Sequence, residues 1–338
     1  MNFELEDRLL LSYAMYATTK QSQYLTIDRD NLFVGISQAV KFVIKFVRLK
    51  LCCKGTIFFA YIQIFRANIW SNQKNLVPLS TFIFGCMDFK IFGNRQMPHL
   101  LLIPGLGVSC EIFLPLIQLL ESRFCIIAAQ VDGFTLDKPT AFTSIDDQAL
   151  QVINYIQKEC HGHIACAYGL SLGGKILSHV LERNQISISH AILDAAPLLP
   201  LPKWLVKPLS HLQSLNVWTC YHWTSFWRWL FASHYFDVLL DECRKIYPFG
   251  GRRAVIDGYY SVYTTKLCAI APTDVYYWYG TKEAFIARMQ AKHLLSLHST
   301  AHVQIFPGMN HGQLLIDHPN EVAQRIVDIA SACIFSGQ

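Results

Sequence analysis

From about residue 80 onward, the chain alternates short apolar runs with longer amphipathic runs, and this alternation constrains the fold more than any other feature. Apolar runs of about four to eight residues are typical of strands that are buried on both faces, whereas longer amphipathic runs are typical of helices with one face on a core. Repetition of the order strand, helix, strand predicts an α/β fold, in which helices cover a mostly parallel sheet.

The pattern also gives the positions of the expected elements. We expect strands at 80–91 (one strand or two short ones), 99–103, 124–130, 163–168, 190–194, 275–279 and 302–306. We expect helices at 110–121, 145–159, 172–183, 282–297 and 320–335.

The alternation stops between residues 200 and 271, where no run typical of a buried strand occurs. We therefore predict an inserted helical layer over 200–271. Aromatic residues are dense in this segment, and they could form the core of a small helical subdomain, line a pocket, or do both. Its tryptophans are Trp204, Trp218, Trp223, Trp227 and Trp229.

Residues 1–78 do not follow the alternation, and we predict that they form an extension to an α/β domain of residues 79–338. Within 36–51, apolar residues fall on one helical face and basic residues on another, which predicts a basic amphipathic helix. Such a helix can dock on the α/β domain, and it is also compatible with peripheral contact to an anionic membrane surface. The apolar positions are Val40, Val43, Ile44, Val47 and Leu51, and the basic ones are Lys41, Lys45 and Arg48.

Charge and hydropathy exclude several classes of protein. The most apolar region, 33–65, is interrupted by basic residues, so no spanning helix is expected there. Acidic residues Glu4, Glu6 and Asp7 precede the first apolar run, where an export signal would carry positive charge. The net charge of +5 includes no dense basic tract beyond the N-terminal segment, so a nucleic-acid partner is not expected.

The 11 cysteines are scattered without the spacing of a disulfide framework or a zinc site. We expect reduced thiols and a cytoplasmic protein. Cys160, His161 and His163 lie close together, but no second cluster complements them, and we interpret them as a surface loop without a metal.

The segment Gly169-Leu170-Ser171-Leu172-Gly173 joins an expected strand to an expected helix. A turn this sharp brings the positions two residues before and after the serine into close backbone contact, and glycine at both avoids a clash. The strained turn exposes the serine hydroxyl above the sheet. We therefore predict that Ser171 is a nucleophile.

A serine nucleophile needs a base within hydrogen-bond reach and a carboxylate to orient that base. Glu283 follows the expected strand 275–279, and His311 follows the expected strand 302–306, so both lie past the carboxyl end of a strand, where ligands gather in open α/β sheets. Asp194, at the end of 190–194, is the alternative acid. Asp274 and His318 are weaker rivals, because Asp274 starts a strand and His318 adjoins a proline at the start of the last helix.

Acyl transfer also needs donors for a developing oxyanion. The backbone N–H of Leu172 follows the nucleophile at a helix N-terminus. The second donor is expected from the loop after 99–103, with Leu106 as the first candidate and Gly107 as the second.

At these residues the chain resembles the α/β-hydrolase family, serine type, and in particular capped esterases and lipases. The resemblance covers roughly residues 80–338 and is carried by LIPGLG, DGF at 132–134, GLSLGG, YGTKE and NHG. It implies a triad of Ser171, Glu283 and His311, oxyanion donors at Leu106 and Leu172, and a cap at 200–271. Pro104 stands where many members have histidine, and glutamate stands where aspartate is commoner.

We therefore expect a cofactor-independent serine hydrolase that cleaves an ester, thioester or amide through an acyl-enzyme. The aromatic cap predicts a small-molecule substrate with an apolar acyl or alcohol part. Two alternatives remain: acyl transfer on the same triad, and a non-catalytic ligand-binding protein that keeps the fold.

Overall fold

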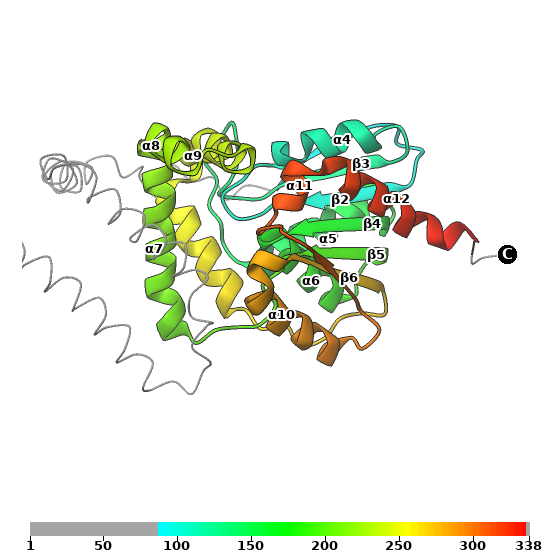
Figure 1. The fold of residues 1–338 in the computed structure, drawn as a ribbon. Coiled ribbons are helices and arrows are strands. Elements are labelled where there is room, and N and C mark those ends of the chain that lie inside the picture. The colour runs from blue at the N-terminus through cyan, green and yellow to red at the C-terminus, as the bar shows by residue number, and fades with distance from the viewer. Residues whose placement is uncertain (1–86, 336–338) are drawn as a thin grey trace, which may run out of the picture. The chain divides into compact units, whose positions relative to one another are not determined.

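A computed structural model of the chain describes residues 87–335. The predicted basic helix within 36–51, the boundary at residue 78 and the first part of the expected strand 80–91 lie outside the described residues, and they stay predictions. In the described part, the predicted α/β architecture is confirmed (Figure 1).

The sheet has seven strands in the order β1-β3-β2-β4-β5-β6-β7. Strand β1 pairs with β3 antiparallel, and every other neighbouring pair is parallel. Each expected strand is present, although β4 and β5 are longer than predicted and β1 covers only the end of the run expected there. The strands are β1 (Asp88–Phe92), β2 (His99–Ile103), β3 (Cys125–Gln130), β4 (His163–Leu170), β5 (Ser187–Asp194), β6 (Asp274–Gly280) and β7 (His302–Phe306).

Successive residues of the central strands point to opposite faces of the sheet, and both faces are buried. In β2, Leu101 and Ile103 belong to one core cluster, whereas Leu100 and Leu102 belong to the other. The apolar runs in the sequence are continuous for this reason, since a strand covered on both faces has no polar side. Helices α5, α6 and α10 pack on the first face, and α4, α11 and α12 on the second (Figure 1).

The helices agree with the sequence pattern in position, with differences at their ends. The expected helix 110–121 is a 3-10 turn followed by a helix with proline in its first turn, and the expected start of helix 282–297 is also a 3-10 turn. The short helix α11 was not predicted from the sequence. The elements are η3 (Cys110–Phe113), α4 (Leu114–Leu120), α5 (Ile145–Glu159), α6 (Leu172–Arg183), η4 (Thr281–Glu283), α10 (Ala284–Leu297), α11 (Gln313–Asp317) and α12 (Pro319–Phe335).

Between β5 and β6 the chain forms the predicted helical insertion, which consists of α7 (Lys203–His222), α8 (Thr224–Phe231) and α9 (His234–Thr264). Helix α9 bends at Gly251, whose φ of 57° and ψ of −154° are not helical. Trp218 and Trp227 are buried, whereas Trp204 and Trp229 are 72% and 63% exposed. A role in the core of the insertion therefore fits Trp218 and Trp227 and does not fit Trp204 and Trp229.

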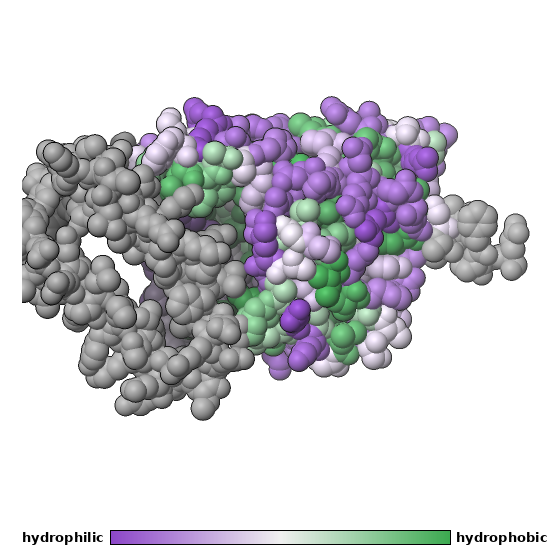
Figure 2. Space-filling view, in the orientation of Figure 1, coloured by the Kyte–Doolittle hydropathy of each residue, from purple (hydrophilic) through white to green (hydrophobic). Residues whose placement is uncertain are grey.

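The described surface mixes polar and apolar residues. Figure 2 shows apolar areas separated by hydrophilic ones on one face of the molecule. Among residues 87–335, no helix is both long enough and apolar enough to cross a bilayer.

Candidate active site

Ser171 occupies a single-residue turn between a strand and a helix. Strand β4 ends at Leu170 and helix α6 begins at Leu172, so the chain reverses direction at the serine. Its φ of 52° lies in the left-handed region and its ψ is −109°, a combination that costs energy for any residue with a side chain. The Ser171 N–H donates a hydrogen bond of 2.7 Å to the carbonyl oxygen of Asp194, which ties the turn to the end of β5.

The two glycines around the serine are required by contact, as predicted. A Cβ atom on Gly169 would lie 2.6 Å from the carbonyl oxygen of Gly173. A Cβ atom on Gly173 would lie 2.1 Å from the carbonyl oxygen of Ile103, at the end of β2. Both distances are shorter than any real contact of a Cβ atom, so larger residues would force the turn apart.

His311 and Glu283 are brought together from two separate loops. His311 lies between β7 and α11, and Glu283 ends η4 just after β6. The distance between His311 Nδ1 and Glu283 Oε2 is 2.7 Å. With Glu283 ionised, this contact places the proton on Nδ1 and leaves Nε2 as a proton acceptor.

The electrostatics of the pair favour the imidazolium form. The side chain of His311 is 48% exposed, and its partial desolvation alone would lower its pKa. The charge of Glu283, its hydrogen bond and the more distant charge of Asp194 together raise that pKa above its ordinary value. A carboxylate so placed stabilises the positive charge that a base acquires when it accepts a proton.

The histidine loop lies beside the serine turn. A Cβ atom on Gly312, the residue after His311, would be 3.1 Å from Cδ1 of Leu170, the residue before Ser171. The loop is also held from the other side, because the Tyr235 hydroxyl of α9 donates a hydrogen bond of 2.7 Å to the carbonyl oxygen of His311. Sequence reasoning missed Tyr235, since nothing in the local pattern of the insertion indicates a contact 76 residues away.

The alternative acid, Asp194, has a different environment. Its side chain is buried and accepts a hydrogen bond from the Tyr168 hydroxyl. Burial raises the pKa of Asp194 to about 7, opposed by the Tyr168 bond, with Glu283 raising it further. In the described part of the chain, the carboxylate within hydrogen-bond distance of His311 is that of Glu283.

The weaker rivals lie away from this pair. Asp274 is the first residue of β6, at the opposite end of that strand from Glu283, and it lies 3.3 Å from His190. His318 ends helix α11, where it is exposed.

The loop after β2 lies against the serine turn. A Cβ atom on Gly105 would be 3.6 Å from the Cβ of Ser171, so the backbone that carries Leu106 lies next to the nucleophile candidate. Gly107 has a φ of +79°, a conformation that favours glycine. Leu172 is the first residue of α6, where a backbone N–H has no partner within the helix. One predicted oxyanion donor, Leu106, thus follows a residue that packs against Ser171, and the other, Leu172, directly follows Ser171 in the chain.

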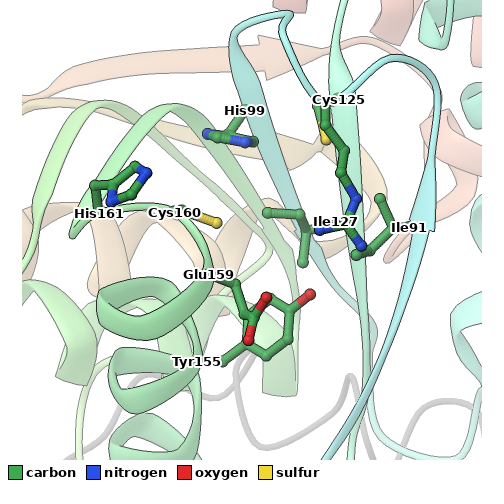
Figure 3. Close-up of a pocket in the computed structure, with 9 residues that line it drawn as sticks. Ile91, His99, Cys125, Ile127, Tyr155, Glu159, Cys160 and His161 are labelled. Carbon is green, nitrogen blue, oxygen red and sulfur yellow. The ribbon is translucent and has the colours of Figure 1, made fainter.

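A cavity of about 250 Å³ lies elsewhere, at the opposite edge of the sheet. Figure 3 shows its lining, which includes the starts of β2 and β3 at His99 and Cys125. Cys160 and His161 also line it. The interpretation of Cys160, His161 and His163 as a surface loop is only partly right, because Cys160 is buried and His163 begins β4. Because Ser171, Glu283 and His311 all follow the carboxyl ends of strands, this cavity is separate from the candidate active site.

The fold and the position of the serine turn are those of an α/β hydrolase. Comparison of the sequence with known families leads to the same class. The Alpha/beta hydrolase family matches residues 100–325. The chain belongs to this family. A search of curated proteins finds no match.

Many solved structures share the fold at low sequence identity. An α/β-hydrolase family protein from Desulfitobacterium hafniense is 18% identical with a TM-score of 0.59, over 72% of this chain and 99% of that one. A structure from a study of carboxylesterases of Nitrososphaera gargenis is 16% identical with a TM-score of 0.60, over 74% and 96%. An enol-lactonase from Burkholderia xenovorans is 15% identical with a TM-score of 0.58, over 72% and 96%. At these identities the likeness establishes the fold.

Proposed function

We propose that the protein is a serine hydrolase that cleaves a carboxylic ester, with Ser171 as nucleophile, His311 as base and Glu283 as the acid that orients the base. The observation that carries the proposal is the 2.7 Å contact between His311 Nδ1 and Glu283 Oε2, in a loop that contacts the strained turn of Ser171. A carboxylate in contact with Nδ1 holds the imidazole in the tautomer whose Nε2 can accept the proton of a serine hydroxyl.

The proposed reaction has two stages. The Ser171 oxygen attacks the ester carbonyl carbon while its proton passes to His311 Nε2, and the imidazolium then gives that proton to the departing alcohol. Water next attacks the acyl carbon and loses a proton to His311. The bond from that carbon to the Ser171 oxygen then breaks, and the imidazolium returns the proton to Ser171 as the carboxylic acid leaves. In both stages the backbone N–H groups of Leu106 and Leu172 would stabilise the negative oxygen.

The proposed substrate is a small ester with an apolar acyl or alcohol part. The Leu170 side chain lies beside Gly105 and Gly312, next to the serine turn, and Leu106 reaches from the neighbouring loop to Gly258 of the helical insertion. The insertion also contributes Tyr235, which is bonded to the carbonyl oxygen of His311. Apolar walls with a few polar groups are typical of pockets that bind such ligands. Thioesters and amides are open to the same chemistry.

The test is covalent labelling with a fluorophosphonate probe. The full-length protein should be labelled at one site, and Ser171→Ala should abolish both labelling and the turnover of aryl esters. Ser299→Ala changes an exposed serine in the turn before β7 and serves as the matched control, which should keep both. Labelling that survives Ser171→Ala would contradict the proposal.

Two further outcomes separate the alternatives. Acyl transfer uses the same acyl-enzyme, so transfer of the acyl group to an added alcohol or thiol in preference to water would indicate an acyltransferase. Tight binding of an ester without labelling or turnover would indicate a binding protein that keeps the fold.

A further inference from the structure

A buried carboxylate of the helical insertion holds the loop that carries the predicted oxyanion donor. Glu242, on α9, is 3% exposed. Its Oε2 accepts a hydrogen bond of 2.9 Å from the N–H of Ser109 and one of 2.6 Å from the Ser109 hydroxyl. Ser109 is fully buried and ends the loop that begins at Pro104 after β2.

The same carboxylate is balanced by charge from its own helix. Lys245 Nζ donates to Glu242 Oε1 over 2.8 Å, and it also lies 3.2 Å from Glu111 in η3. Glu111 in turn lies 3.5 Å from Lys90 of β1. Glu242 therefore has a cationic partner on one oxygen and two donors from Ser109 on the other, so its buried charge is compensated on both sides.

Helix α9 contacts the loop a second time, beyond its bend at Gly251. A Cβ atom on Gly258 would lie 2.7 Å from Cδ1 of Leu106, so the absence of a side chain at 258 makes room for Leu106. The two contacts lie on opposite sides of the bend in α9 and at opposite ends of the segment from Leu106 to Ser109. The insertion thus fixes both ends of the segment that includes the predicted donor.

We infer that Glu242 is a positioning residue, which acts through Ser109 to hold the Leu106 amide where an oxyanion would form. The inference rests on the proposed function, because it matters only if this loop stabilises an oxyanion. Loss of one oxyanion donor commonly lowers kcat by about a hundredfold or more. A donor that is displaced, and not removed, should cost less than that.

The experiment measures kcat, KM and the rate of fluorophosphonate labelling for Glu242→Ala, with aryl ester as substrate. We expect kcat and the labelling rate to fall together by about 10- to 100-fold, with KM nearly unchanged, because the loop contributes to the transition state. The matched control is Asp241→Ala on the same helix, which breaks an ion pair with Arg228 inside the insertion and leaves the loop contact intact. It should keep the kcat of the original protein.

Ser109→Ala keeps the N–H donor and removes only the hydroxyl, and it therefore decides the question if Glu242→Ala does not fold. It should lower kcat in the same direction by a smaller factor. The double variant should be nearly as active as Glu242→Ala alone, because the bond between the hydroxyl and Glu242 is already absent there and the Ser109 hydroxyl is left with only its bond to the Glu111 N–H. Glu242→Gln keeps an acceptor for Ser109 and should recover part of the kcat lost in Glu242→Ala.

The outcomes separate the two proposals. If the unaltered protein is not labelled at Ser171, the proposed function fails. If it is labelled, but folded Glu242→Ala or Ser109→Ala keeps the original kcat and labelling rate, the positioning role is wrong and the hydrolase proposal stands. A rise in KM with an unchanged kcat would also overturn the positioning role, because this result would mean that Glu242 affects substrate binding and not the transition state.

Discussion

Lys175 is a fully buried lysine in the first turns of α6, one helical turn after Ser171. Its Nζ donates a long hydrogen bond of 3.3 Å to the carbonyl oxygen of Leu198. Burial lowers the pKa of Lys175 to about 8, and the charges of Glu182 and Asp146 oppose that shift only in part. The charged form of this side chain is thus less favourable in the folded protein than in the unfolded chain.

The lowered pKa measures the free energy that the folded protein loses by keeping Lys175 protonated. A fall from the ordinary value of 10.5 to about 8 corresponds to about 3 kcal/mol at about 1.4 kcal/mol per pH unit. Below pH 8 both states carry the proton, and the folded state bears the whole cost. Between pH 8 and 10.5 the unfolded state binds more protons than the folded one, so the contribution of Lys175 to the free energy of unfolding rises with pH.

Replacement of Lys175 by methionine keeps an unbranched side chain, one heavy atom shorter, and removes the charge. It also removes the bond to the carbonyl oxygen of Leu198, a loss of about 1 kcal/mol. We therefore expect Lys175→Met to raise the free energy of unfolding at pH 7 by about 2 kcal/mol, and the gain should shrink to nothing or reverse by pH 10.5.

Urea unfolding at a series of pH values from 6 to 10.5 measures both effects. The thiols and phenols with raised pKa values titrate in the same alkaline range in both proteins, so above about pH 8 the difference between the two curves isolates Lys175. The charge of Lys175 also helps to lower the pKa values of His179 and His293, so the two curves differ through these histidines only toward pH 6. A variant that is less stable than the original protein at pH 7, or a difference that does not change with pH, would refute the reasoning.

Two further changes test the site itself. Glu283→Gln should lower kcat by about a thousandfold or more, because the base loses the charge that stabilises its imidazolium. Asp194→Asn should change kcat less than tenfold. Steady-state kinetics on an aryl ester measure both effects. Gly173→Ala should leave too little folded protein to measure or lower the melting temperature by many degrees, since its Cβ would be 2.1 Å from a carbonyl oxygen. Gly162→Ala, with a φ of +73° and no atom within 4 Å of the added Cβ, should cost only about 1 to 2 kcal/mol, and thermal unfolding compares the two.

The sheet could be predicted because its evidence is local. A strand that is buried on both faces has to be apolar throughout, so β2 and β3 could be identified from their own residues. The serine turn was predictable for a similar reason, since the contact between Gly169 and Gly173 spans only four residues and leaves a fixed spacing in the sequence.

Contacts between distant parts of the chain left no such spacing. Glu242 and Ser109 are 133 residues apart, and Tyr235 and the His311 carbonyl are 76 apart. In the sequence, Glu242 and Tyr235 are ordinary residues of a helical segment, and nothing near them indicates the loops that they contact. Helix α11 was missed because its five residues are fewer than the two turns that an amphipathic pattern needs.

The choice between Glu283 and Asp194 shows why position along the chain does not determine a role. Both carboxylates follow the carboxyl end of a strand, and β5 and β6 are neighbours in the sheet. The structure buries Asp194, and burial raises its pKa to about 7 although the hydrogen bond from the Tyr168 phenol opposes that shift, so its ionised form is disfavoured. A group that has to stabilise an imidazolium must remain ionised while the proton moves. Glu283, at the end of η4 and three positions beyond the end of β6, lies within hydrogen-bond distance of His311 and can take this role.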